Sequence, residues 1–394
     1  MKSLKSKIAA SALALSLAGG VFVTNPTTAE AAGKPLNIKK VLNLPAEGVT
    51  TPSETFTFKF TAHSKNGDEN KATELPKVSD VTIAYTADDK DDNNTKKDGK
   101  QLIKESADAL ASVNWTESGQ FTYTVTEFVD ENSKTDYMTY SQASYLVSVF
   151  VGKTDDGTGY EVKDIQIKKI KDDAGKDITD PKKEEYTPGD SSDTTKDKNK
   201  FAFENNYDKE DGNNNPGSGS DITDDDKKGF ALRKTVDDKS NDDFKFKLTV
   251  EKPVGTNSAA DATFTYKIVN KEGTAGEEKT GTYGTSIENI ILKHNERLVF
   301  TKVLLGSKVT VEETDSGRYE GSVSSSSFNG TTGTEKSGII GDQTGGNFVE
   351  YENKTQTATG LLVDNLPFIA LVAVAGAGIA FFIKGKKEDE EALA

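Results

Sequence analysis

The residues of this chain best suited to chemistry are a lysine, a glutamate and an asparagine, which recur in the same order in its two halves. In the first half the glutamate is Glu127, at the end of the run that starts at Phe121. The apolar residues of this run alternate with threonines, which predicts a strand with one buried face, and the alternation places Glu127 on that face. A buried carboxylate is costly unless it is paired, hydrogen-bonded or protonated, so Glu127 needs a partner.

The second half repeats the arrangement in Val309-Thr310-Val311-Glu312-Glu313. Here Glu313 shares a face with the two valines, whereas the alternation places its neighbour Glu312 outside. Two strands that each end in an inward-facing glutamate need a common explanation.

The lysine lies in the first predicted strand of each half, and the asparagine closes a final aromatic-x-Asn group. The lysines are Lys40 and Lys234, and the asparagines are Asn205 and Asn353. In the first half, Lys39 competes with Lys40 for the inward position. Asn206 likewise competes with Asn205.

Together these three residue types predict one reaction. In an apolar interior a lysine loses its proton more readily, and a glutamate holds its proton more tightly. The neutral amine is then a nucleophile. The carboxylic acid can hydrogen-bond the asparagine carbonyl oxygen, polarise it and carry protons to the departing ammonia. The product is an intramolecular Lys–Asn isopeptide bond, formed once on folding, so the chain is not expected to be an enzyme with turnover.

The elements that position these residues are predicted to be strands. Alternating Phe-x-Phe runs at Phe56 to Phe60 and Phe244 to Val250 follow the lysine strand of each half, and helical periodicity is hard to find between residues 33 and 355. We therefore expect an all-β protein of two tandem sandwiches. The expected domains are residues 32–207 and 227–354, joined by a Gly-, Asn- and Asp-rich linker at 208–226.

The two ends of the chain are predicted to carry a secretory signal and a membrane stop. A basic start, an apolar stretch at Ile8 to Val23 and the small-x-small site Ala29-Glu30-Ala31 predict a signal peptide at residues 1–31. Near the other end, Leu366 to Ile383 holds 18 residues without a charge, which predicts a transmembrane helix. The lysines at Lys384 to Lys387 then predict a cytoplasmic end, within a C-terminal region of residues 355–394.

Composition excludes several classes of function. The formal net charge of −15 disfavours nucleic acid as a partner. The chain has no cysteine and only two histidines, which leaves little for a metal site, a thiol site or a histidine-based triad. The acidic clusters at Asp88 to Asp92 and Asp221 to Asp226 lack the spacing of a calcium loop, so we expect solvated loops, no metal and no cofactor.

These residues resemble the T-antigen-type backbone pilins of Gram-positive bacteria and their pilin isopeptide-linkage domains. In the second half, the matching residues are Leu292 to Glu296, Leu304-Leu305-Gly306 and Val309 to Glu313, similar to the family's LKDGE, LPxG and YTVTE elements. In the first half, the matching residues are Leu36 to Leu42, Phe121 to Glu127 and Phe203-Glu204-Asn205. The resemblance covers roughly residues 34–210 and 227–354, together with the C-terminal region.

The resemblance implies Cna protein B-type, immunoglobulin-like sandwiches in which an isopeptide bond ties the first strand to the last. Carried over residue by residue, the bonds are Lys40–Asn205, promoted by Glu127, and Lys234–Asn353, promoted by Glu313.

The resemblance also extends to a sorting signal for a sortase. Gln356-Thr357-Ala358-Thr359-Gly360 is similar to L-P-x-T-G ahead of an apolar span, and the bond between Thr359 and Gly360 would be cleaved. Gln356 and Thr357 replace the Leu-Pro pair, which favours a dedicated pilin sortase; a plain single-span anchor remains the alternative. In the family the acceptor lysine lies seven residues before the first bonding asparagine, which gives Lys198, with neighbouring lysines as alternatives.

The expected function is that of an exported backbone subunit of a pilus, located on the cell surface and linked to the cell wall. Its expected partners are a sortase, neighbouring pilin subunits, peptidoglycan and, before processing, the membrane. The alternative is an unpolymerised, wall- or membrane-anchored adhesin or stalk with the same domains.

Overall fold

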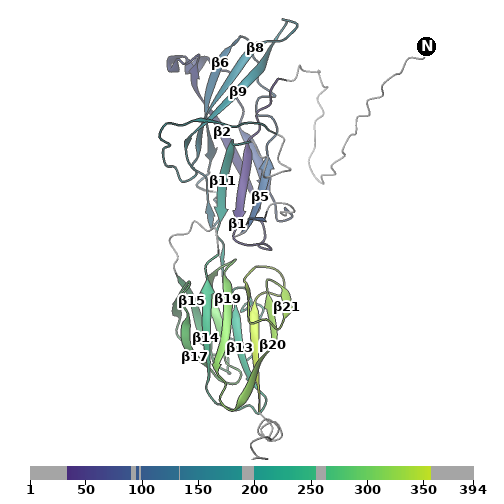
Figure 1. The fold of residues 1–394 in the computed structure, drawn as a ribbon, viewed down its shortest axis with the longest axis vertical. Helices are drawn as coiled ribbons and strands as arrows, with labels where there is room; N and C mark the ends of the chain where they lie inside the picture. Colours follow the sequence, from purple (N-terminus) through teal and green to yellow (C-terminus); the bar gives the residue numbers. More distant parts are fainter. Residues whose placement is uncertain are drawn as a thin grey trace, which may run out of the picture.

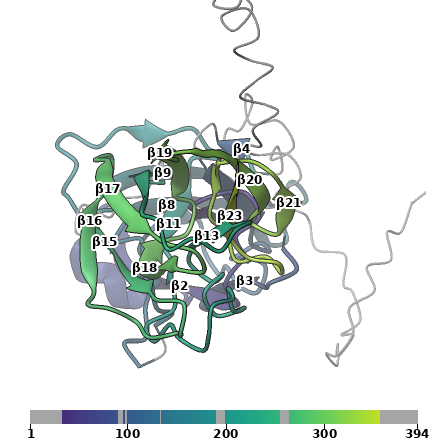
Figure 2. The same ribbon diagram turned by 90° about the horizontal axis from the view of Figure 1, so that it is seen from below.

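A computed structural model describes residues 33–89, 95–96, 99–132, 134–188, 199–253 and 263–355. These residues form two β-sandwiches that stack end to end along the long axis of the molecule (Figure 1). Viewed along that axis, the sandwiches overlap, so the described part of the chain is an elongated rod (Figure 2). The prediction of an all-β fold with two tandem sandwiches is confirmed.

The first sandwich pairs two sheets over an apolar core. One sheet has the order β4-β5-β1-β11-β7 and the other has the order β10-β9-β8-β6-β2-β3. The strands of the first sheet are β1 (Lys39–Leu44), β4 (Thr95–Lys96), β5 (Gly99–Glu105), β7 (Met138–Thr139) and β11 (Ala202–Tyr207). Those of the second are β2 (Glu54–Lys65), β3 (Val81–Tyr85), β6 (Gly119–Phe128), β8 (Ser144–Lys153), β9 (Tyr160–Lys171) and β10 (Lys183–Glu184). A short 3₁₀ helix, η1 (Glu69–Glu74), follows β2.

The second sandwich repeats this plan. One sheet has the order β16-β15-β18-β13-β23-β20-β21, with β12 also paired to β18, and the other has the order β17-β14-β19-β22. The strands of the first sheet are β12 (Glu210–Asp211), β13 (Ala231–Val236), β15 (Thr263–Val269), β16 (Lys279–Thr282), β18 (Arg297–Leu304), β20 (Tyr319–Phe328), β21 (Thr331–Gly333) and β23 (Phe348–Thr355). Those of the second are β14 (Phe244–Glu251), β17 (Ile287–Leu292), β19 (Lys308–Asp315) and β22 (Ser337–Ile339).

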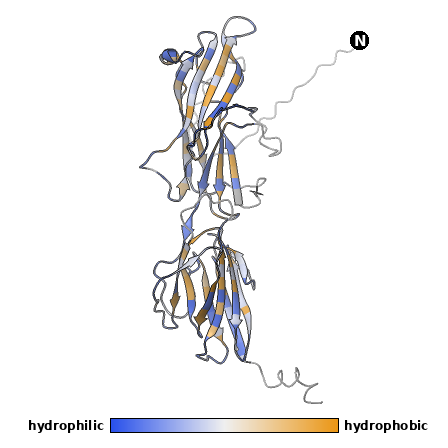
Figure 3. Ribbon diagram, turned by 60° about the vertical axis from the view of Figure 1, so that its left-hand side comes forward, coloured by the Kyte–Doolittle hydropathy of each residue, from blue (hydrophilic) through white to orange (hydrophobic). Residues whose placement is uncertain are grey.

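Alternation along the strands builds both cores. Hydrophobic and hydrophilic residues follow one another along many of the strands (Figure 3). Because successive side chains of a strand point to opposite faces of its sheet, such strands bury one face and leave the other to solvent. On β6, Phe121, Tyr123 and Val125 are all buried in the first core. On β14, the alternate residues from Phe244 to Val250 are buried in the second core.

In each sandwich the first long strand lies beside the last one, and the two run parallel. β1 pairs with β11 so that Lys40 faces Phe203, and β13 pairs with β23 so that Lys234 faces Tyr351. Parallel neighbours cannot be joined by a tight turn, so nearly the whole sandwich lies between the two strands in sequence. This pairing places the predicted lysine and asparagine of each half on adjacent strands.

The two sandwiches also touch each other. The loop after β1 reaches the second sandwich, where Ala46 and Val49 pack into its core cluster. Asp342 accepts a hydrogen bond from the backbone N–H of Thr50 at 2.8 Å and forms an ion pair with Lys209 at 3.0 Å. The junction therefore combines apolar packing with polar contacts.

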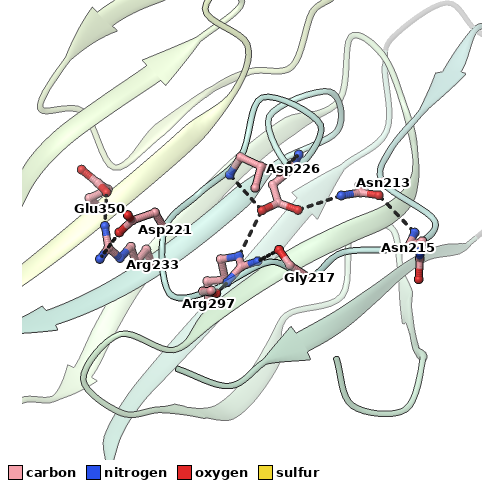
Figure 4. A network of polar contacts seen from close by, with 10 residues as sticks. Asn213, Asn215, Gly217, Asp221, Asp226, Arg233, Arg297 and Glu350 are labelled. Atoms are coloured by element: carbon pink, nitrogen blue, oxygen red, sulfur yellow. Dashed lines mark hydrogen bonds and ion pairs between the residues drawn. The ribbon is translucent and has the colours of Figure 1, made fainter. Parts of the chain in front are cut away.

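The segment 208–226, which its composition predicts to be a linker, lies along the second sandwich. Arg297, fully buried on β18, donates from Nε to Asp226 at 3.0 Å and from its terminal nitrogens to the carbonyl oxygens of Gly217 and Gly219 at 2.6 Å each (Figure 4). A planar guanidinium suits such a buried fork of acceptors. The segment is held by a residue some 70 positions later in the chain, which its local composition does not reveal.

Several predictions concern residues outside the described part. The signal peptide at 1–31, the sorting signal, the apolar stretch 366–383 and Lys198 all lie there. Within the residues that the structure describes, no helix has the length and apolar character needed to cross a bilayer.

Candidate functional site

In the first sandwich the structure brings Lys40, Glu127 and Asn205 together. Lys40 and Asn205 come from β1 and β11 of one sheet, and Glu127 comes from β6 of the opposite sheet. The Lys40 Nζ atom lies 2.6 Å from Glu127 Oε2, and Asn205 Nδ2 donates to Glu127 Oε1 at 2.7 Å. The side chains of Lys40 and Glu127 are 0% and 1% exposed, so the whole arrangement is closed to solvent.

The second sandwich assembles the matching set from corresponding strands. Lys234 on β13 and Asn353 on β23 face Glu313 on β19. The Lys234 Nζ atom lies 2.9 Å from Glu313 Oε1 as an ion pair, and Asn353 Nδ2 donates to the same oxygen at 3.0 Å. In both sandwiches the lysine faces the aromatic residue two positions before the asparagine.

The Phe-x-Phe strands line both sites in the same way. Phe58 on β2 is the cross-strand partner of Glu127, and Phe246 on β14 is the partner of Glu313. The Lys40 Nζ atom lies 4.3 Å from the centre of the Phe56 ring. The equivalent distance in the second sandwich, from Lys234 to Phe244, is 4.4 Å. An aromatic face attracts the ammonium and keeps water away, which makes the site less polar than a surface ion pair.

Burial shifts the proton affinities in the direction that the reaction needs. It lowers the pKa of the Lys40 ammonium to about 8, although the Glu127 charge acts in the opposite direction. It also raises the pKa of the Glu127 carboxyl, against the opposing charge of Lys40. Burial likewise lowers the pKa of Lys234. Desolvation thus favours the neutral amine and the protonated acid, the forms required for attack on an amide.

The orientation of the asparagine differs from the sequence-based expectation. We expected the acid to contact the asparagine carbonyl oxygen, but both glutamates accept a hydrogen bond from the amide nitrogen. In the first sandwich the amide oxygen accepts from the backbone N–H of Ser141 at 2.7 Å. A backbone N–H can only donate, so the oxygen of Asn205 must point to Ser141 and its nitrogen to Glu127.

The structure also shows which of the neighbouring candidate residues lie in the sites. Lys40, rather than its neighbour Lys39, reaches Glu127. Asn206 points to the other side of β11, where it accepts a hydrogen bond from Asn43. Glu312 is exposed on the outer face of β19, as the alternation predicts.

Other residues near the sites carried no recognisable sequence signal. Ser141 acts through its main chain, and Gly321 lies opposite Asn353 on β20. A Cβ atom on Gly321 would lie 1.9 Å from Glu313 Oε2, so a residue without a side chain is needed there.

The remaining predicted site residues divide between described and undescribed parts of the chain. Lys198, Thr359 and Gly360 lie outside the described residues. In the acidic cluster that starts at Asp221, side chains form ion pairs with Arg233, Lys227, Lys228 and Arg297. No group of three or more potential metal ligands occurs in the part of the chain that the structure describes.

The described part of the chain thus consists of two tandem β-sandwiches, and each has a buried Lys–Glu–Asn triad between its sheets. A family model described as a domain of unknown function (DUF7601) matches residues 228–355, which are the second sandwich. No curated protein matches the chain.

Among solved structures, the chain is similar to pilus proteins. A major pilin from Streptococcus pyogenes is 19% identical, with 82% of this chain and 99% of that chain covered and a TM-score of 0.32. The T3.2 major pilin of the same organism is 18% identical, with 82% and 98% covered and a TM-score of 0.31. A pilus-presented adhesin is 12% identical, with 82% and 100% covered and a TM-score of 0.22.

Proposed function

We propose that this chain is a pilus-type surface protein whose two sandwiches lock themselves with Lys–Asn isopeptide bonds. The observation that carries the proposal is the buried triad, present twice, with the same strand register and the same aromatic lining. An unreacted buried lysine and glutamate are expensive for a fold to keep. Amide formation removes both the charge of the lysine and its need for a partner.

The reaction follows from the positions of the two glutamate oxygens. In the first sandwich the Lys40 amine attacks the side-chain carbonyl carbon of Asn205. The new C–Nζ bond forms and the C–Nδ2 bond breaks. Glu127 contacts the nucleophile through one oxygen and the leaving nitrogen through the other, so it can take a proton from the amine and deliver one to the departing ammonia. One ammonia leaves for each bond, and Glu127 returns to its starting state.

The biological role in this proposal is mechanical. A bond between the first and last strands keeps the sandwich closed even when its sheets separate, which favours resistance to force and proteolysis. Sortase would cleave between Thr359 and Gly360 and join Thr359 to an amine, for which Lys198 of another subunit is the candidate, or to the cell wall. The alternative is an anchored stalk or adhesin with the same locked domains that does not polymerise.

Two measurements on protein released from cell walls test the proposal. Two isopeptide bonds predict an intact mass lower by two ammonias, about 34 Da, than that of the same chain without bonds. A full mass would contradict self-locking. A ladder of covalent multimers on denaturing gels supports the pilus backbone, and its loss in Lys198→Ala would locate the acceptor. Monomers alone, with the mass deficit retained, would favour the anchored stalk.

The pH dependence of the reaction provides a further prediction for the first sandwich. In the reactive form Lys40 is neutral and Glu127 is protonated, whereas in the ion pair Lys40 is protonated and Glu127 is ionised. The two forms have the same number of protons, so a change of pH does not alter the balance between them. Because the pKa of Lys40 is lowered to about 8, we expect a plateau below that pH. Above it the pair loses its proton, and the rate should fall about tenfold per pH unit. In acid, below the raised pKa of Glu127, the pair takes up a second proton, Lys40 stays charged and the rate should fall again.

This dependence can be followed as bond formation in refolding chains over a series of pH values. A rate that instead climbs above about pH 8 would show that the neutral amine alone limits the reaction. Glu127 would then not be needed as an acid.

A further inference from the structure

The two triads differ at the asparagine oxygen. In the first sandwich, Asn205 Oδ1 accepts a hydrogen bond of 2.7 Å from the Ser141 main-chain N–H. In the second, Asn353 Oδ1 is buried, and no hydrogen-bond donor among the described residues reaches it. The two sites match in the identity of their lysine, acid and aromatic lining. The asparagine oxygen is therefore one of two chemical differences between them, and the other is the single Glu313 oxygen that Lys234 and Asn353 share.

That oxygen is where negative charge develops. When the lysine amine adds to the amide carbon, the carbonyl oxygen becomes the oxyanion of a tetrahedral intermediate. A donor already aimed at this position stabilises the transition state, and removing one such donor from an enzyme costs about 10²- to 10³-fold in rate. The Ser141 N–H is fixed before the reaction, because it belongs to the main chain.

Asp173 holds this donor in place. Its Oδ1 atom accepts from the Ser141 hydroxyl at 2.7 Å and from the backbone N–H of Glu204 at 2.9 Å. Glu204 is the neighbour of Asn205 on β11, so one carboxylate ties the donor segment to the strand that carries the reacting amide. The other oxygen of Asp173 forms an ion pair with Lys169 at 2.5 Å, which fixes the carboxylate itself.

The second sandwich has a different neighbour at the equivalent place. Gly321 faces Asn353 across the β20–β23 pair, and a Cβ atom there would lie 2.7 Å from Asn353 Oδ1. Glu313 and Gly321 also line a pocket of about 530 Å³. The oxygen of Asn353 thus lies beside a backbone that presents no donor to it.

From these contacts we infer that the Ser141 N–H is an oxyanion donor for the Lys40–Asn205 reaction and that Asp173 is its positioning residue. This inference rests on the proposed function and deepens it. Its consequence is an order of events: the first sandwich locks before the second. Each chain then has a period in which only its N-terminal sandwich is crosslinked.

The test follows both bonds in one sample. Full-length chains purified in denaturant from inclusion bodies are diluted into detergent buffer, quenched at intervals and digested, and the two crosslinked peptides are quantified. The single tryptophan, Trp115, lies in the first core, so its fluorescence reports the folding of that sandwich separately. In the wild type, the Lys40–Asn205 peptide should form at least about tenfold faster than the Lys234–Asn353 peptide.

Variants separate positioning from folding. Asp173→Ala should slow the Lys40–Asn205 bond about tenfold while the Trp115 signal and the second bond keep their wild-type rates. Asp173→Asn retains an oxygen acceptor without the charge and should restore most of the rate. Ser141→Pro removes the N–H itself and should cost about 100-fold. If Ser141→Pro does not fold, the Asp173 pair still decides the question.

The outcomes distinguish this inference from the proposal on which it rests. Equal rates for both bonds in the wild type, or an Asp173→Ala rate equal to the wild type, would overturn the oxyanion role while self-locking stands. Slow folding that fully accounts for the slow bond in Asp173→Ala would also overturn it. If neither crosslinked peptide forms in the wild type, the proposed function fails, and this inference fails with it.

Discussion

Glu127→Gln is expected to prevent the first isopeptide bond while the fold and the second bond remain. Glutamine has nearly the shape of glutamate and can still contact both Lys40 and Asn205, but it cannot exchange a proton with either. Since general acid–base catalysis contributes about 10²- to 10⁴-fold, the Lys40–Asn205 bond should be absent from freshly purified protein. The intact mass should then lack only one ammonia, about 17 Da, relative to the mass calculated for the variant.

The chain contains its own controls for this experiment. Glu313→Gln should remove the other bond and leave the first, and the double variant should have its full calculated mass. Glu312→Gln, at the exposed neighbouring position, should keep both bonds. If Glu127→Gln still loses two ammonias, the carboxyl group is not the proton carrier. The contacts of Glu127 with Lys40 and Asn205 would then have a purely structural purpose.

The features of the sites that follow from local periodicity could be predicted from the sequence. A period of two fixes which residues of a strand face the core, so Glu127 and Glu313 could be assigned inward without knowledge of the fold. The choice between Lys39 and Lys40 was harder, because a slip of one residue reverses every side chain of a strand. The β1–β11 pairing, a contact between residues far apart in sequence, resolves it in favour of Lys40.

Features that depend on tertiary pairing could not be predicted in this way. β20 contains a glycine and a run of serines, which are poor strand formers, yet it pairs along β23. Strand propensity is weak compared with the hydrogen bonds that a neighbouring strand offers. The same reasoning applies to Ser141, whose contribution comes from a backbone N–H that every residue except proline possesses. No side-chain pattern could have marked it.

The contacts of the segment 208–226 could not be predicted from its composition either. Its glycines, asparagines and aspartates suggest a flexible tether, but those backbone carbonyls and carboxylates are also the acceptors that a buried arginine needs. Arg297 uses them, and the segment becomes part of the second sandwich. A rod whose joints are packed transmits tension from one sandwich to the next, which suits the proposed locking of each domain.

Asn205→Ala is expected to cause the largest loss of stability in the first sandwich. The Lys40–Asn205 bond closes a loop of roughly 165 residues, and the chain-entropy relation for crosslinks gives about 5 kcal/mol for such a loop. For a domain of this size each kcal/mol corresponds to about 2–4 °C, so the Tm should fall by at least about 10 °C.

Because Trp115 lies only in the first core, its fluorescence during heating isolates this transition from that of the second sandwich. Asn353→Ala is the matched control: it should destabilise the second sandwich and leave the Trp115 transition nearly unchanged. Asn206→Ala, which removes only a contact with Asn43, should cost no more than about 1 kcal/mol. An Asn205→Ala transition within about 2 °C of the wild type would mean that no covalent tie joins the terminal strands, since a crosslink of this span must restrict the unfolded chain.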